Sequence, residues 1–93
     1  MKIHSILSLA QRMNVTHIVE EGRFGGLSAY MYYLHGLNVT SIEFLPLDDV
    51  TRDLERLSNG RINLLTGDGS EIVPKVVESL SSGENARVVV IFD

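Results

Sequence analysis

At 93 residues, with 44% hydrophobic and 22% charged residues, the chain has the size and composition of one small globular domain rather than of a disordered segment. Its net charge of −4 disfavours a nucleic-acid-binding module, and its lack of cysteine excludes disulfide scaffolds and thiolate zinc sites. No apolar run approaches the roughly 20 residues that span a bilayer, so we expect a cytoplasmic protein that binds neither nucleic acid nor a membrane.

The first half of the chain alternates between helical and strand periods. Apolar residues at helical spacing over Ile3–Met13 predict a short amphipathic helix, and the β-branched segment Val15–Glu21 predicts a strand. A glycine cluster follows, and a second helix is expected over Leu27–His35 with Gly36 as its stop. Four residues form the predicted apolar face of that helix: Leu27, Tyr30, Met31 and Leu34.

The second half repeats this alternation. The pattern predicts a strand over Asn38–Phe44, a helix over Asp48–Ser58 and a strand over Arg61–Gly67. Ser70 is the expected N-cap of a further helix with an apolar inward face. The last segment, Arg87–Asp93, is an uninterrupted apolar run, which is typical of a strand covered on both faces.

Strands separated by helices of about 10–15 residues predict right-handed crossovers and a parallel sheet. We therefore expect one α/β domain over residues 1–93: a three-layer Rossmann-like fold with strand order 3-2-1-4 and a ligand crevice at the carboxyl ends of the strands. The strand at Val88–Phe92 resembles a central strand, although it is the last one. A long apolar edge is an aggregation hazard, so we expect an incomplete, doubly wound sheet whose second half is missing. The alternative is a partner chain, or a second copy, that covers this edge.

The segment Val19–Ala29 carries the strongest functional pattern, because a strand runs into a glycine-rich turn that opens a helix. From Gly22 the chain reads G-R-F-G-G, which lacks the second glycine of the dinucleotide fingerprint, and no lysine follows the turn as a P-loop requires. Glu20 and Glu21 precede the turn, and only one of them can point at the crevice. A carboxylate there repels phosphate and favours an amino-acid-bearing nucleoside with an ammonium or sulfonium group. The alternative is that the glycines mark only a tight turn.

Acidic residues also end the other strands at this edge. Glu43 lies 21 residues after Gly22, where a carboxylate can hold both hydroxyls of a ribose; the alternative is a solvated strand-end glutamate. Asp68 follows the third strand, where it can also cap a turn or helix. Asp93 ends the fourth strand and is a candidate metal ligand or catalytic carboxylate.

Together these residues resemble the class I S-adenosylmethionine-dependent methyltransferases, in particular the small-molecule O-methyltransferases and the cephalosporin-hydroxylase-like branch. The resemblance covers about residues 16–93. The matching motifs are E-x-G…G-x-S-A over Glu20–Ala29, SIE ending at Glu43, GD at Gly67-Asp68 and VVVIFD ending at Asp93.

The resemblance implies a role for each motif residue. The methionine part of S-adenosylmethionine would be held by Glu20 and by the turn, with Gly22, Arg23, Phe24, Gly26 and Ser28 as cofactor-binding residues. Glu43 would bind the ribose hydroxyls, and Asp68, next to Gly67, would bind the adenine amine. Asp93 would lie near the transferred methyl as the catalytic residue and, in metal-dependent members, as the ligand of a divalent cation such as Mg²⁺.

Two residues depart from the family pattern. Glu21 is charged where the family usually has an apolar residue, and Leu27 replaces the second glycine of the usual pair. We expect the cofactor-binding half of a methyltransferase for a small-molecule acceptor, inactive as this short chain. The alternatives are a fragment of an NAD-dependent oxidoreductase and a non-catalytic α/β module that pairs with a partner through the Val88–Phe92 edge.

Overall fold

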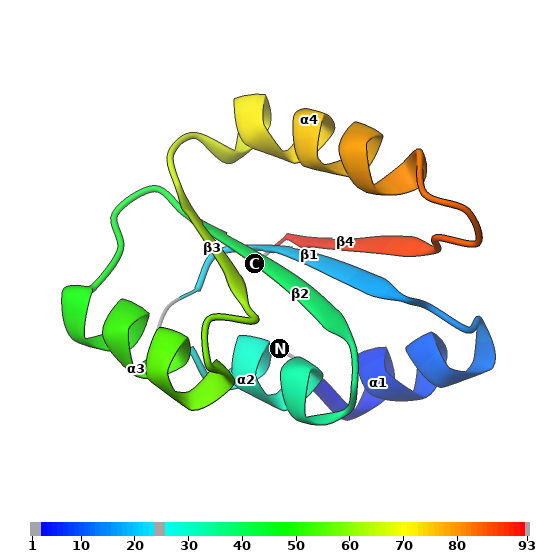
Figure 1. The fold of residues 1–93 in the computed structure, drawn as a ribbon, viewed down its shortest axis with the longest axis horizontal. Helices are drawn as coiled ribbons and strands as arrows, with labels where there is room; N and C mark the ends of the chain where they lie inside the picture. Colours follow the sequence, from blue (N-terminus) through cyan, green and yellow to red (C-terminus); the bar gives the residue numbers. More distant parts are fainter. Residues whose placement is uncertain (1–2, 24–25, 93) are drawn as a thin grey trace.

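The computed structural model describes residues 3–23 and 26–92, over which helices and strands alternate (Figure 1). The elements are α1 (Ile3–Arg12), β1 (His17–Glu21), α2 (Leu27–Leu34), β2 (Asn38–Glu43), α3 (Asp48–Ser58), β3 (Asn63–Thr66), α4 (Gly69–Ser81) and β4 (Val88–Phe92). Every helix and strand that the sequence predicts is present, and the differences in their bounds are confined to the ends. No helix in these ranges is long and apolar enough to cross a membrane.

The four strands form one parallel sheet in the order β3-β2-β1-β4, as predicted. Helices α1, α2 and α3 lie on one face of the sheet and α4 lies on the other, which gives three layers (Figure 1). In the register of the sheet, Glu20 of β1 lies beside Ser41 of β2 and Ile91 of β4. This Rossmann-like arrangement brings the carboxyl ends of the strands to a common edge.

The core has one apolar layer on each face of the sheet. On the α1–α3 face the buried cluster consists of Leu7, Ile18, Ala29, Tyr32, Val39, Leu54 and Ile62. On the α4 face it consists of Val19, Ile42 and Val73, with partly buried residues of α4 and β4 around them. Because successive side chains of a strand point to opposite faces, Ile18 and Glu20 lie toward α2, whereas Val19 and Glu21 lie toward α4.

The buried face of α2 differs from the predicted one. Ala29 and Tyr32 are fully buried, whereas Leu27 and Leu34 are 65% and 56% exposed. The helix has only eight residues and contacts β2, α1 and α3. The face that α2 turns to the core is therefore set by the small Ala29, which approaches its neighbours closely, and by the large ring of Tyr32. The most apolar stripe of the helix does not set it.

The N-cap of α4 lies two residues before Ser70, at Asp68, for which the sequence offers a capping role as an alternative. Asp68, not Ser70, is the N-cap: its Oδ1 accepts hydrogen bonds from the backbone N of Ser70 at 2.9 Å and from the Ser70 hydroxyl at 2.8 Å. A carboxylate accepts both donors at once and also complements the positive end of the helix, so it is the better cap of the two.

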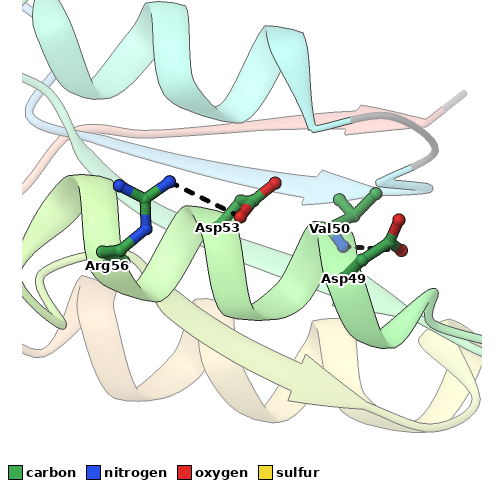
Figure 2. Close-up of polar contacts among 4 residues, drawn as sticks. All are labelled: Asp49, Val50, Asp53 and Arg56. Atoms are coloured by element: carbon green, nitrogen blue, oxygen red, sulfur yellow. Dashed lines mark hydrogen bonds and ion pairs between the residues drawn. The ribbon is translucent and has the colours of Figure 1, made fainter.

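Helix α3 is amphipathic, with Leu54 and Ser58 buried. On its exposed face, Arg56 Nη2 lies 3.6 Å from Asp53 Oδ1, and Asp49 Oδ1 accepts from the backbone N of Val50 at 2.9 Å (Figure 2). The ion pair contributes little stability because both side chains are largely exposed. Burial of Leu54 therefore anchors α3 more than its charges do.

Strand β4 lies at one edge of the sheet and pairs with β1. Val88, Val89, Val90 and Ile91 are half-buried and Phe92 is 69% exposed. Among the described residues the strand is therefore less covered than the expected two-sided burial, because α4 packs over one of its faces only in part.

Candidate functional site

Backbone hydrogen bonds align the carboxyl ends of β1, β2 and β3 along one edge. The amide of Gly22, just after β1, donates to the carbonyl of Ile42 at 2.9 Å, and the amide of Gly67, just after β3, donates to the carbonyl of Glu43 at 3.1 Å. Glu43 therefore lies between the glycine turn on one side and the β3–α4 connection on the other. This edge is the candidate functional site.

The glycine turn is closed by its own backbone and enters α2 directly. The amide of Gly26 donates to the carbonyl of Arg23 at 2.8 Å, and the carbonyl of Gly26 accepts from Tyr30 at 3.1 Å. Gly26 has φ 82° and lies at the N-cap position of α2, where it provides no side-chain acceptor. The first N–H groups of α2 therefore have no capping side chain from this residue. Phe24 and Gly25 lie outside the described residues.

Glu20 and Glu21 diverge, as the alternation of the strand requires. Glu20 is fully buried, and its carboxylate accepts a hydrogen bond from the hydroxyl of Ser28 in α2 and one from the hydroxyl of Ser41 in β2 at 3.4 Å. The carboxyl group of Glu21 lies against Gly69 at the start of α4, where it fills the space of a Cβ. Glu20 thus links the first turn of α2 to β2, and the hydroxyl of Ser28 is engaged by Glu20.

Arg23 carries the main feature that sequence reasoning missed. The resemblance placed it in the cofactor-binding set, yet its side chain turns inward and is only 2% exposed. It donates to Ser41, Leu65 and Thr51. Burial lowers the pKa of the guanidinium below its ordinary value, and the negative charges of Glu43 and Glu20 oppose this shift. Nothing in the sequence of the turn predicts that this arginine is buried.

The remaining predicted residues lie at the same edge with different exposure. Glu43 is half-buried at the end of β2, on the face that also carries Ser41. Asp68 is exposed, and its carboxylate is engaged by the first turn of α4. At Gly67, which has φ 147°, a Cβ would lie 2.6 Å from Ile72 Cδ1, so the tip of the Ile72 side chain would have to move to admit a side chain there.

The structure thus brings Glu20, Arg23, Ser28 and Glu43 together on the α2–α3 side of the edge, while Asp68 faces α4. Asp93, the predicted catalytic residue and metal ligand, lies outside the described residues. Over residues 3–23 and 26–92 there is no group of three or more His, Asp or Glu side chains placed to hold a metal ion. The Mg²⁺ expectation stays a prediction that depends on Asp93.

An apolar rim borders this edge. Five large apolar residues that follow β2, begin α2 or end β4 are the most exposed ones described, at 59–77%: Leu27, Phe44, Leu45, Leu47 and Phe92. Exposed apolar side chains that occur singly are ordinary on protein surfaces.

A scan against protein-family models and searches of curated proteins and of solved structures found no match to this chain. Its function is therefore inferred from the chemistry of the carboxyl edge.

Proposed function

We propose that this chain is the cofactor-binding part of an S-adenosylmethionine-dependent methyltransferase that acts on a small-molecule acceptor. One observation carries the proposal. The backbone hydrogen bonds from Gly22 to Ile42 and from Gly67 to Glu43 align the end of β2 between the glycine turn and the β3–α4 connection, and the residue at that end is the half-buried Glu43. A carboxylate in that position can accept hydrogen bonds from both hydroxyls of a ribose, while the first N–H groups of α2, which Gly26 leaves without a capping side chain, would face the rest of the ligand.

The charge distribution favours a nucleoside without phosphate. Arg23 is the one cation in the described part of the turn, and its donors are directed to protein acceptors. It therefore offers no charge to a pyrophosphate. Glu43 does not separate the two cofactors, because a carboxylate at this position also binds a ribose in NAD sites; what disfavours the NAD-dependent alternative is the missing G-x-G-x-x-G spacing.

In this proposal the chain binds and orients, and the cofactor supplies the chemistry, since a sulfonium is already an activated methyl donor. Glu43 would fix the ribose, and the turn at Gly22 and Gly26 would fix the methionine part. Glu20 and Ser28 would stiffen the turn from below. Asp68 would present its second carboxylate oxygen at the adenine end while Oδ1 caps α4.

Binding of S-adenosylhomocysteine to the 93-residue chain tests this proposal. We expect the ligand to raise the melting temperature, because it binds the folded state only, and NAD to leave it unchanged. Glu43→Gln should raise the dissociation constant for S-adenosylhomocysteine by about tenfold or more, since hydrogen bonds to a charged acceptor contribute roughly 1.5–3 kcal/mol.

The matched control is Glu78→Gln. Glu78 is an exposed glutamate of α4, nine residues beyond Gly69 and therefore about 13 Å along the helix from the edge. Its substitution should leave the affinity unchanged. Stabilisation by NAD in place of S-adenosylhomocysteine, or an equal loss of affinity in both variants, would refute the assignment.

A further inference from the structure

Arg23 joins the glycine turn to three other elements. Its Nε donates to the hydroxyl of Ser41 at 3.0 Å, and its Nη2 donates to the carbonyls of Ser41 at 2.7 Å and Leu65 at 2.9 Å. Its Nη1 donates to the hydroxyl of Thr51 at 3.1 Å. One side chain thus connects the turn to β2, β3 and α3.

This geometry depends on a guanidinium. A buried charge is costly unless its hydrogen bonds are satisfied, and here all three nitrogens donate to acceptors in fixed directions. The planar fork of arginine reaches them at once, whereas the ammonium of lysine is a single point of charge on a flexible stem. Glu20 and Glu43 provide compensating negative charge. Replacement of Arg23 by lysine keeps the positive charge beside them and removes the planar guanidinium, so the two contributions can be tested separately.

The anchored elements are those that carry the proposed ligand-binding groups. Glu43 follows Ser41 by two residues in β2, and Gly67 follows Leu65 by two residues in β3. The carbonyl of Arg23 also accepts the hydrogen bond from Gly26 that closes the turn. The same residue therefore shapes the turn through its backbone and fixes its distance from Glu43 through its side chain.

We infer that Arg23 is a positioning residue: its side-chain hydrogen bonds to β2, β3 and α3 hold the glycine turn and Glu43 in the spacing that an adenosyl ligand requires. The inference rests on the proposed function for the identity of the ligand. It assigns Arg23 no ligand contact of its own, in contrast to the cofactor-binding role that the family resemblance implies.

The test compares Arg23→Lys, which keeps the charge and loses the fork, with Ser58→Ala. Ser58 is fully buried, and its hydroxyl donates to Leu54 at 2.7 Å and accepts from Ile62 at 3.2 Å. It lies at the far end of α3, about 15 Å along the helix from its start, so its loss destabilises the fold without touching the turn.

Two readouts are compared at a temperature where every variant is folded: the dissociation constant of S-adenosylhomocysteine and the hydrogen exchange of the Gly22 and Gly26 amides. Arg23→Lys should weaken binding by about tenfold or more and speed exchange at both glycines. Ser58→Ala should leave both readouts within about twofold of the original protein. Thr51→Val, which removes one anchor only, should give a smaller loss in the same direction and replaces Arg23→Lys where the latter does not fold.

Two outcomes of Arg23→Lys, or of Thr51→Val where it replaces that variant, would overturn the inference. One is unchanged hydrogen exchange at Gly22 and Gly26, and the other is a loss of affinity no greater than that of Ser58→Ala.

Failure of the proposed function has a separate signature: the unsubstituted chain does not bind S-adenosylhomocysteine. The exchange rates of the two glycines would then still decide whether Arg23 positions the turn.

Discussion

Substitution of Gly26 by alanine measures how tightly the glycine turn is packed against α3. Gly26 has φ 82°, and a Cβ there would lie 3.1 Å from both Val50 Cγ1 and Leu54 Cδ1. Gly36 offers a matched control, because its φ is 83° and a Cβ there would meet nothing within 4 Å. The two substitutions therefore share a left-handed φ, and a Cβ is crowded at buried Gly26 but not at exposed Gly36.

The expected magnitudes follow from these two terms. A left-handed conformation costs an alanine about 1–2 kcal/mol, and the lower entropy of the unfolded chain returns roughly 0.4–1 kcal/mol. Gly36→Ala should therefore destabilise the protein by about 1 kcal/mol. Gly26→Ala adds the overpacking of Val50 and Leu54, which costs roughly 1–3 kcal/mol, so its total loss should reach about 2–4 kcal/mol.

Urea unfolding followed by circular dichroism gives both free energies, and thermal unfolding checks them. For a domain of this size about 1 kcal/mol corresponds to 4–8 °C in the melting temperature, so the two variants should be clearly separated. Equal losses for Gly26→Ala and Gly36→Ala would refute the reasoning, because they would mean that α3 yields to the extra methyl and that the turn is not held by close packing.

Two further substitutions address the polar contacts of the edge. Asp68→Ala should cost about 1 kcal/mol through loss of the α4 cap, whereas Asp68→Asn, which keeps a side-chain oxygen, should recover most of that stability in thermal unfolding; equal losses would contradict the capping role. Glu20→Gln should cost roughly 1–3 kcal/mol in urea unfolding, because it removes a buried charge that accepts from two hydroxyls and compensates Arg23. The exposed Glu84→Gln is its control, and a Glu20→Gln variant as stable as that control would exclude a structural role for the charge.

The architecture follows from the sequence because its determinants are local or nearly so. Helix α3 has the predicted bounds Asp48–Ser58, since its apolar stripe and the Asn-Gly stop lie within a few residues of each other. The strand order 3-2-1-4 is that of the doubly wound arrangement, in which each strand–helix–strand crossover is right-handed whatever its side chains. The sequence offers both Ser70 and Asp68 as caps of α4, and only the backbone path selects Asp68.

The orientation of α2 and the burial of Arg23 could not be predicted, because partners distant in the sequence decide them. Hydropathy favours Leu27 and Leu34 as core residues, but contacts with β2, α1 and α3 select Ala29 and Tyr32. The acceptor residues of Arg23 lie 18, 28 and 42 residues further along the chain. Nothing in G-R-F-G-G distinguishes an arginine that turns inward from one that faces a ligand.

The burial of Glu20 changes how a positively charged ligand would be recognised at this edge. A carboxylate that is fully buried and bonded to two hydroxyls acts on a ligand only through its field, and the neighbouring guanidinium of Arg23 offsets that field. The carboxylates left to face a ligand are those of Glu43 and Asp68, at the ribose and adenine positions of the proposed site. The ribose would then be fixed by the position of Glu43 relative to the turn, and the methionine part would be held by backbone groups. The spacing between the glycine turn and Glu43 that Arg23 maintains therefore matters more to ligand binding than the net negative charge of the proposed site.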